Sequence, residues 1–318
     1  MRIVSLTCSN TEIVWALGMT DTLVGVDDHS DFPVDVVSRL PRVGPDLDID
    51  VEKVAELSPD LVLASLTVPG HERIVERLER AKLPFVATEP VSVADVYDDV
   101  RKIGALLGAS ARAEAVIDAM RAELDAPADS AEVDRRPAIL VEWWPKPVIV
   151  PGKLSWVSQM LAVAGASNPL DGELVKSRSI TDAEAAAFDP DAIVIAWCGV
   201  PTAKYRPEIV RRRPAWRNLR AVEQNRIYAV PEAFLGRPGP RLVEGVRAFR
   251  KIVVDCTRGL PRRYESGRPS TSSICASATA SASFARSSDA RSSVHFAMAR
   301  SAFACSASTA LRASAVSS

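Results

Sequence analysis

The sequence lacks the features of several common functional classes. Its 39 basic and 40 acidic residues nearly cancel, so it shows no basic surface for nucleic acid or for an anionic membrane. No run approaches the roughly 18 consecutive apolar residues that a membrane-spanning helix needs. No glycine-rich phosphate loop follows the first expected strand, since Leu17-Gly18 instead ends a helix. We therefore expect no nucleic-acid partner, no transmembrane segment and no nucleotide, which leaves a small molecule or a protein as the partner.

Cysteine and histidine are also scarce. The 5 cysteines have no paired spacing, so neither a zinc ribbon nor a disulfide framework is indicated. His29 lies in Asp27-Asp-His-Ser-Asp31, but one histidine among loop carboxylates lacks metal-ligand spacing and favours a surface turn. A triad of Cys8, His29 and an aspartate can be drawn, yet no nucleophile elbow accompanies it. We expect no catalytic residue, no metal site and no covalent cofactor.

One segment of the chain occurs twice. Residues 50–64 and 182–196 each read as a short amphipathic helix, a Pro-Asp turn and a buried strand, with Pro59-Asp60 matching Pro190-Asp191. A loop, a helix with an early glutamate and another strand follow each copy. The repeat predicts two similar αβ lobes, and paired lobes usually hold a ligand between them.

The glutamates of these two helices are Glu72 and Glu208. An exposed acid at the matching place of each lobe could form a two-point charged contact with a partner protein. Each can equally be a helix-start glutamate that the helix dipole favours.

Expected strands alternate with helices along the chain, which indicates a mostly parallel sheet in each lobe. Ser9-Asn-Thr-Glu12 and Thr181-Asp-Ala-Glu184 read as capping boxes that open helices. Residues 92–124 read as one continuous helix that Gly104 and Gly108 weaken, so it is either kinked or two helices end to end. We interpret it as a stiff connector between the lobes.

The predicted domains are an N-terminal αβ lobe (1–90), a connecting helix (91–126), a C-terminal αβ lobe (127–258) and a tail (259–318). The tail is mostly Ser and Ala from residue 266 onward and has no apolar periodicity, so we expect it to be disordered. An expected strand at residues 3–6 leaves no room for an export signal ahead of it. If Met1 is the true start, a cytoplasmic protein is expected.

Candidate ligand contacts follow the expected strands, because open αβ sheets bind ligands beyond the carboxyl ends of their strands. They are Cys8, Ser9, His29, Asp46 and Ser65 in the first lobe, and Trp143, Trp144, Lys153, Trp156, Trp197, Cys198 and Phe234 in the second. The four tryptophans of this set indicate a flat or apolar ligand, although strand-end tryptophans also pack protein cores.

An ordered set of segments resembles the ferric-siderophore and cobalamin class of ABC-transporter substrate-binding proteins. These are residues 2–18, Leu23-Val-Gly-Val26, Leu40-Pro-Arg-Val-Gly44, residues 57–63 and Asn225-Arg-Ile-Tyr-Ala-Val230. Within the class, residues 142–147 and 152–156, Ala164-Gly165, Ser177-Arg178 and Trp197-Cys-Gly199 are similar to a branch usually labelled cobalamin-binding. Asp46 and Ser65 stand where well-studied vitamin B12 binders have aromatic residues.

The resemblance implies an α/β protein with two Rossmann-like lobes joined by a long rigid helix, which is the class III periplasmic-binding-protein fold. It implies a monomeric, non-catalytic component of an ABC importer in the periplasm or another extracytoplasmic space. The ligand would be cobalamin or a similar corrinoid, and Glu72 and Glu208 would dock on the permease.

Two alternatives stay open. One is a binder of a ferric siderophore or haem, for which Lys153, Arg178, Arg206 and Arg237 are the available cations. The other is a soluble cytoplasmic enzyme or carrier that uses the same fold.

Overall fold

The computed structural model describes residues 1–126 and 135–258, which lie in one compact unit. Two predictions fall outside these residues, namely the disordered tail 259–318 and the first residues of the second lobe, 127–134. Within the described part of the chain, no helix combines the length and the apolar character that crossing a membrane requires.

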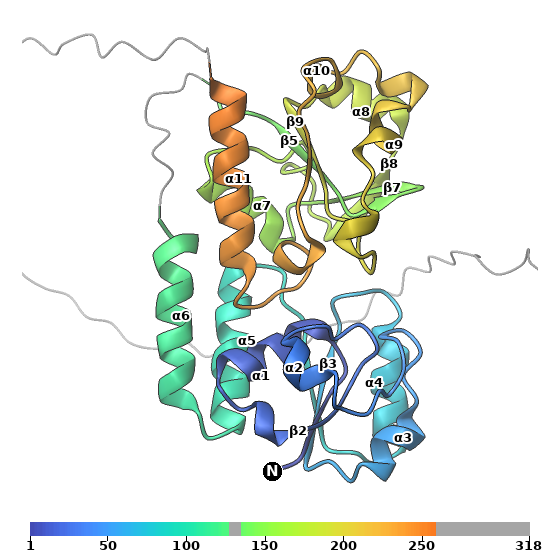
Figure 1. Ribbon diagram of the computed structural model, residues 1–318, viewed down its shortest axis with the longest axis vertical. Helices are drawn as coiled ribbons and strands as arrows, with labels where there is room; N and C mark the ends of the chain where they lie inside the picture. The colour runs from blue at the N-terminus through green and yellow to red at the C-terminus, as the bar shows by residue number, and fades with distance from the viewer. Residues whose placement is uncertain (127–134, 259–318) are drawn as a thin grey trace, which may run out of the picture. The chain divides into compact units, whose positions relative to one another are not determined.

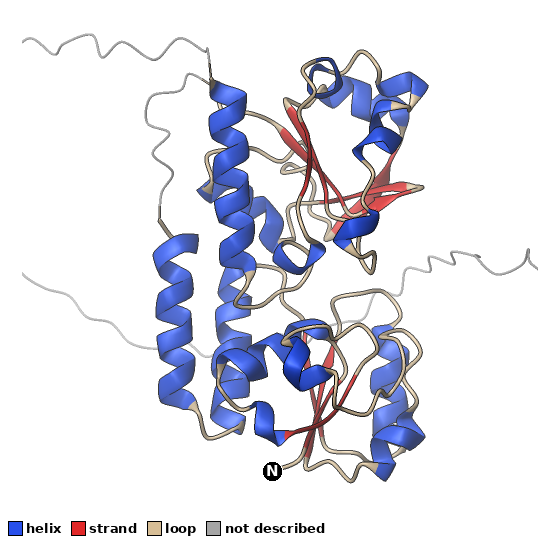
Figure 2. Ribbon diagram, in the orientation of Figure 1, coloured by secondary structure: helices blue, strands red, loops and turns tan. Residues whose placement is uncertain are grey.

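The N-terminal lobe is a four-stranded parallel sheet in the order β2-β1-β3-β4 (Figures 1 and 2). The strands are β1 (Ile3–Ser5), β2 (Leu23–Val26), β3 (Leu61–Ser65) and β4 (Phe85–Thr88). The helices of this lobe are α1 (Cys8–Ala16), α2 (Val34–Val37), α3 (Val51–Glu56) and α4 (His71–Arg80). The short 3-10 helix η1 (Thr20–Thr22) precedes β2. Alternate residues of the strands pack on opposite sides, as the side-chain period of two requires. Ile3 and Leu63 join the core cluster of α1 and α5, whereas Val4 and Val62 join that of α3 and α4.

The C-terminal lobe has a parallel sheet in the order β10-β9-β5. Its strands are β5 (Ile139–Glu142), β9 (Ala192–Ile195) and β10 (Ile227–Ala229). The helices are α7 (Trp156–Val163), α8 (Asp182–Phe188), α9 (Pro207–Arg211), α10 (Arg220–Glu223) and α11 (Leu242–Thr257). Three 3-10 helices lie between them, η2 (Thr202–Lys204), η3 (Pro214–Trp216) and η4 (Glu232–Phe234). The repeat thus correctly predicts two parallel sheets, each with its repeated strand, β3 or β9, between two neighbours.

A second sheet in this lobe is antiparallel and was not predicted. It consists of β6 (Trp144–Pro145), β7 (Val148–Pro151) and β8 (Ser177–Ile180) in the order β6-β7-β8. The expected strand at Val148–Val150 therefore exists, but it does not belong to the parallel sheet.

The expected connecting helix is an antiparallel pair, α5 (Val93–Leu106) and α6 (Ser110–Leu124), that lie side by side (Figure 1). Gly108, at a φ of +69°, supplies the left-handed residue at the reversal. Arg101 of α5 bonds Glu114 of α6, and the Tyr97 hydroxyl donates to Asp125 at 3.1 Å. The prediction of one continuous helix is wrong. The break does lie at Gly108, but the two helices pack side by side rather than end to end, with Val100 and Ile117 in one buried apolar cluster.

One of the two predicted capping boxes forms. The Thr181 hydroxyl caps α8 and Glu184 returns the bond to the backbone N–H of Thr181. The box at Ser9–Glu12 is wrong, since α1 begins at Cys8 after Thr7. Glu12 is instead buried and paired with two arginines that lie far away in the sequence.

The Pro-Asp turn of the repeat has the same function in both lobes. Asp60 accepts a hydrogen bond from the backbone N–H of Arg2 at 2.7 Å, and Asp191 accepts one from Ala138 at 2.7 Å. Each aspartate thereby fixes the start of its lobe's first strand to the start of the repeated strand. Asp191 also binds two arginines, Arg135 at 2.6 Å and Arg220 at 2.8 Å.

We expect these two aspartates to differ in their contribution to stability. The Asp191 side chain is 7% exposed and that of Asp60 is 58% exposed. Asp191→Ala should lower the free energy of unfolding by about 2 kcal/mol, because it removes the buried acceptor of the Ala138 N–H, whereas the partly exposed Arg135 and Arg220 can turn to solvent. Asp60→Ala should lower it by less than about 1 kcal/mol. Urea denaturation of the two variants measures both values, and equal losses would contradict the assignment.

Candidate functional site

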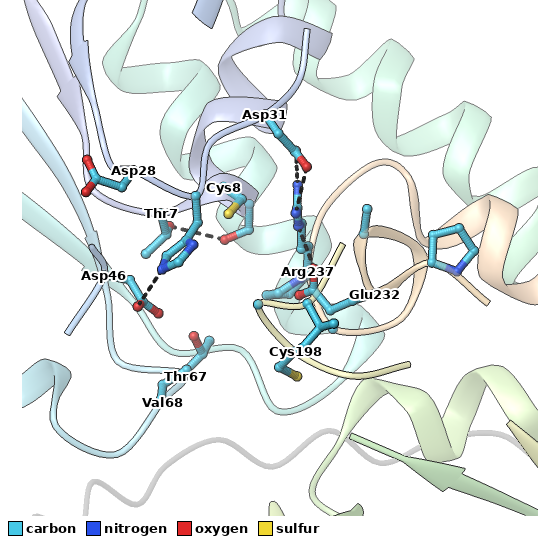
Figure 3. A pocket seen from close by; sticks show the side chains of 18 of the residues that line it. Thr7, Cys8, Asp28, Asp31, Asp46, Thr67, Val68, Cys198, Glu232 and Arg237 are labelled. Atoms are coloured by element: carbon cyan, nitrogen blue, oxygen red, sulfur yellow. Dashed lines mark hydrogen bonds and ion pairs between the residues drawn. The ribbon is translucent and has the colours of Figure 1, made fainter. Parts of the chain in front are cut away.

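A cavity of about 520 Å³ lies between the two lobes (Figure 3). On the N-terminal lobe it is lined by the segments that follow β1 and β2, by the turn at Asp46, and by the loop between β3 and α4. On the C-terminal lobe the lining segments follow β9 and β10. These are the carboxyl ends of parallel strands, where backbone groups and loop side chains converge in open αβ sheets.

Two imidazoles flank one carboxylate on the N-terminal wall. The Nε2 atom of His29 lies 3.7 Å from Asp46, and that of His71 lies 3.6 Å from the other carboxylate oxygen. His71 is 3% exposed, and its Nδ1 accepts the backbone N–H of Val68 at 3.4 Å. The His71 imidazole holds the pKa of Asp46 below its ordinary value, so Asp46 is a stable negative charge on this wall.

Arg237 forms the centre of the opposite side (Figure 3). Its Nε donates to Glu232 at 2.9 Å, and its Nη1 donates to Asp31 at 2.6 Å and to Glu12 at 3.0 Å. Burial raises the pKa of Glu232 although Arg237 lowers it. Burial also raises the pKa of Asp31, but the hydrogen bond and charge of Arg237, together with smaller contributions, leave its pKa below the ordinary value. The guanidinium is therefore committed to protein carboxylates from both lobes.

The described cavity wall is acidic. Its carboxylates are Asp28, Asp31, Asp46 and Glu232, whereas Arg237 is the one arginine or lysine among the lining residues. Because Arg237 already binds three carboxylates, no guanidinium or ammonium on this wall is left to pair with an anionic ligand.

The profile of the periplasmic binding protein family matches residues 3–233. The chain is 32% identical over 258 residues to the uncharacterized ABC transporter substrate-binding lipoprotein YvrC of Bacillus subtilis, covering 79% of each chain. The chain belongs to the periplasmic binding protein family. It is a non-catalytic ABC-transporter substrate-binding protein. Members of this family are periplasmic or otherwise extracytoplasmic, and they are often lipoproteins.

Two further relatives carry ligand names. A vitamin B12-binding protein of Pectobacterium carotovorum is 24% identical, over 76% of this chain and 84% of its own. The apo form of the periplasmic haem-binding protein RhuT from Roseiflexus superposes with a TM-score of 0.70 at 26% identity, over 81% of this chain and 99% of that one. The two parallel sheets of this binding protein thus have the arrangement of class III periplasmic binding proteins.

The cavity brings together a part of the predicted site. Cys8, Ser9, His29, Asp46 and Cys198 line it. Ser65 lies just behind, with its hydroxyl 2.9 Å from that of the lining Thr67. Sequence reasoning named Arg237 only as a cation for an anionic ligand. It missed Asp31, His71 and Glu232, of which Asp31 and Glu232 follow strands closely enough for the strand-end rule to have found them.

The predicted aromatic contacts lie elsewhere. Trp197 is buried, with its Nε1 donating to Glu142 at 2.8 Å, and Trp156 is buried with its Nε1 donating to the carbonyl of Leu235. Trp143 packs against the core and Trp144 is exposed. None of the four lines the cavity, and neither do Lys153 or Phe234. Trp156 and Trp197 thus match the core-packing interpretation, and the role of these six residues in ligand binding stays a prediction.

The cavity thiols are poor nucleophiles. Burial, and after it the nearby Asp27 carboxylate, raise the pKa of Cys8 well above its usual range. The Cys8 sulfur lies 4.0 Å from Asp27, whereas His29 faces Asp46. The imagined triad of Cys8, His29 and an aspartate is therefore not assembled.

We expect slow alkylation of Cys8 for the same reason. At pH 7.5 iodoacetamide should modify it at least about tenfold more slowly than it modifies free cysteine, since the thiolate is the reacting form. Mass spectrometry of the Cys198→Ser variant, which keeps Cys8 as a cavity thiol, measures the rate. Alkylation as fast as that of free cysteine would contradict the raised pKa.

Proposed function

We propose that this protein holds a cobalamin or similar corrinoid in the cavity between its lobes and delivers it to the permease of an ABC importer. The observation that carries the ligand assignment is the acidic wall with its arginine already paired. A corrinoid carries neutral amide side chains, whose N–H groups can donate to carboxylates such as Asp46 and Glu232. The vitamin B12-binding relatives support the same assignment.

The principal alternative is an anionic chelate, either haem with its two propionates or a catecholate ferric siderophore. Such ligands require cations in the cavity. Of the four candidates, Lys153, Arg178 and Arg206 are not lining residues, and Arg178 is paired with Glu173 and Glu184. The fourth, Arg237, is saturated by carboxylates. The charge of the wall therefore favours the corrinoid over the anionic chelates, although haem-binding proteins share the fold.

Equilibrium binding tests the ligand. Cyanocobalamin should bind with a Kd of about 1 μM or tighter, measured by calorimetry, with haemin and a ferric catecholate at least about tenfold weaker. Asp46→Asn should narrow this difference, because it removes one negative charge that anionic ligands meet. Tighter binding of haemin, lost on adding salt, would overturn the corrinoid assignment in favour of the alternative.

We infer that Glu72 and Glu208 contact the permease. Both side chains are exposed, and they occupy the first turns of α4 and α9, one on each lobe. The backbone N–H of Glu72 itself and that of Gly70 hold the pKa of Glu72 below its ordinary value, so it is charged at neutral pH. With one acid on each lobe, the protein can form two separate charged contacts with basic groups of the permease.

The Glu72→Ala/Glu208→Ala double variant tests this contact. Transport of the ligand into vesicles that hold its importer should fall at least about tenfold, because two charged contacts are lost. Ligand affinity of the free protein should stay unchanged. Glu79→Ala/Glu223→Ala, which removes one exposed acid from each lobe at other places, is the matched control. Equal transport by both double variants would contradict the docking role.

A further inference from the structure

One loop of the C-terminal lobe lies against the first helix of the N-terminal lobe. This loop, residues 231–241, joins β10 to α11. A Cβ atom added at Gly239 would lie 3.6 Å from the carbonyl oxygen of Ser9 and 3.9 Å from the side chain of Ile13. The loop and α1 are therefore separated by only about the size of a methyl group at this point.

Two arginines of this loop converge on one buried carboxylate of α1. The Oε1 atom of Glu12 accepts from Arg237 at 3.0 Å and from Arg241 at 3.1 Å. Glu12 is 1% exposed, and its Oε2 atom has no hydrogen-bond partner among the described residues. Glu12 is absent from the cavity wall. It is thus a charged group placed where it contacts the other lobe rather than the ligand.

Aromatic residues from both lobes complete the contact. The guanidinium of Arg241 lies 4.4 Å from the ring centre of Phe32 in the N-terminal lobe and 4.9 Å from that of Phe234 in the C-terminal lobe. Both distances suit cation–π attraction. Arg241 is therefore held between the lobes by groups that belong to each of them.

We propose that Glu12, Arg237 and Arg241 form an interlobe clasp that fixes the spacing of the two cavity walls, with Glu12 as its positioning residue. Through Arg237 the clasp also holds Asp31 of one wall and Glu232 of the other. Its effect on ligand affinity rests on the proposed function, whereas its effect on lobe spacing does not.

A second cross-lobe ion pair provides a contrast. Lys176 of the C-terminal lobe lies 2.7 Å from Glu89 of the N-terminal lobe, and both side chains are about half exposed. Solvent screens such a pair, so its contribution is small. The buried Glu12 contacts are screened far less, and losing one partner leaves the other charges uncompensated.

The clasp responds to pH. Burial raises the pKa of Glu12 to about 7 although Arg237 and Arg241 lower it. If the lobes separate, Glu12 becomes solvated and its pKa falls toward the ordinary 4.5. The clasped form therefore binds a proton more tightly, and acidification from about pH 8 to pH 5 favours it.

The other groups that face Glu12 do not reverse this direction. Arg237 and Arg241 stay charged throughout this range. Burial raises the pKa of Glu232, so its proton uptake acts in the same direction. The pKa of Cys8 is raised well above its ordinary 9.0, so the thiol stays protonated in both forms and does not contribute in this range. Asp31 has a lowered pKa and opposes the trend, but only at pH values near or below its ordinary 3.8.

Distance measurement between spin labels tests the clasp without any ligand. Labels at Glu76 of α4 and Arg211 of α9 report on one lobe each, in a background that lacks the native cysteines. The parent should show a narrower distance distribution at pH 5.5 than at pH 8. Glu12→Gln, which mimics the protonated acid, should lose most of this pH dependence and keep only the part that Glu232 contributes. Glu12→Ala should give a broad distribution at both pH values.

The Glu89→Gln/Lys176→Ala variant is the matched control, because it removes the exposed cross-lobe pair and should leave the distribution as in the parent. If Glu12→Ala does not fold, Arg241→Gln removes the hydrogen bond between Arg241 and Glu12 by changing the less buried of the two residues. An unchanged distribution in the folded Glu12→Ala or Arg241→Gln variant would overturn the clasp. If these variants also bind cyanocobalamin about tenfold more weakly, the clasp contributes to ligand affinity as well as to lobe spacing.

Discussion

The two parallel sheets of this binding protein are anchored on one apolar core. Ile3 and Leu63 of the first sheet and Ile139 and Val194 of the second belong to the same buried cluster, which continues through α5, α6, α7 and α11. Removing this apolar surface from water is the dominant favourable term in folding. Because the strands of each parallel sheet run the same way, their carboxyl ends lie along one edge. The core places these two edges beside the cavity, and the proposed clasp sets their spacing.

The polar contacts between the lobes depend on this arrangement. Arg237 and Arg241 reach α1 only because α11 and α1 are fixed by the same cluster. Once Arg237 lies between carboxylates of both lobes, it cannot serve an anionic ligand, so the contacts that join the lobes also determine the charge that the ligand meets. The Arg237 side chain therefore both joins the two lobes and contributes to the charge of the cavity wall.

Most features that depend on short stretches of sequence were predicted correctly. Strands and the Thr181 capping box follow from short-range periodicity and spacing, and Cys8, His29, Asp46 and Cys198 follow from the rule that strand ends converge. The remaining features depend on partners that are distant in the sequence. The side-by-side packing of α5 and α6 brings together residues such as Arg101 and Glu114. Glu12 pairs with Arg237, which lies 225 residues away in the sequence, so a local pattern could not predict this contact. Trp197 is buried and donates to Glu142, which also lies outside any local pattern.

The acidic wall also has a consequence for molecules that are not the ligand. Phosphate, sulfate and small carboxylates are anions, and each would meet Asp28 and Asp46, while Arg237 is already paired with Asp31 and Glu232. Repulsion of this kind discriminates against competitors independently of any attraction to the intended ligand.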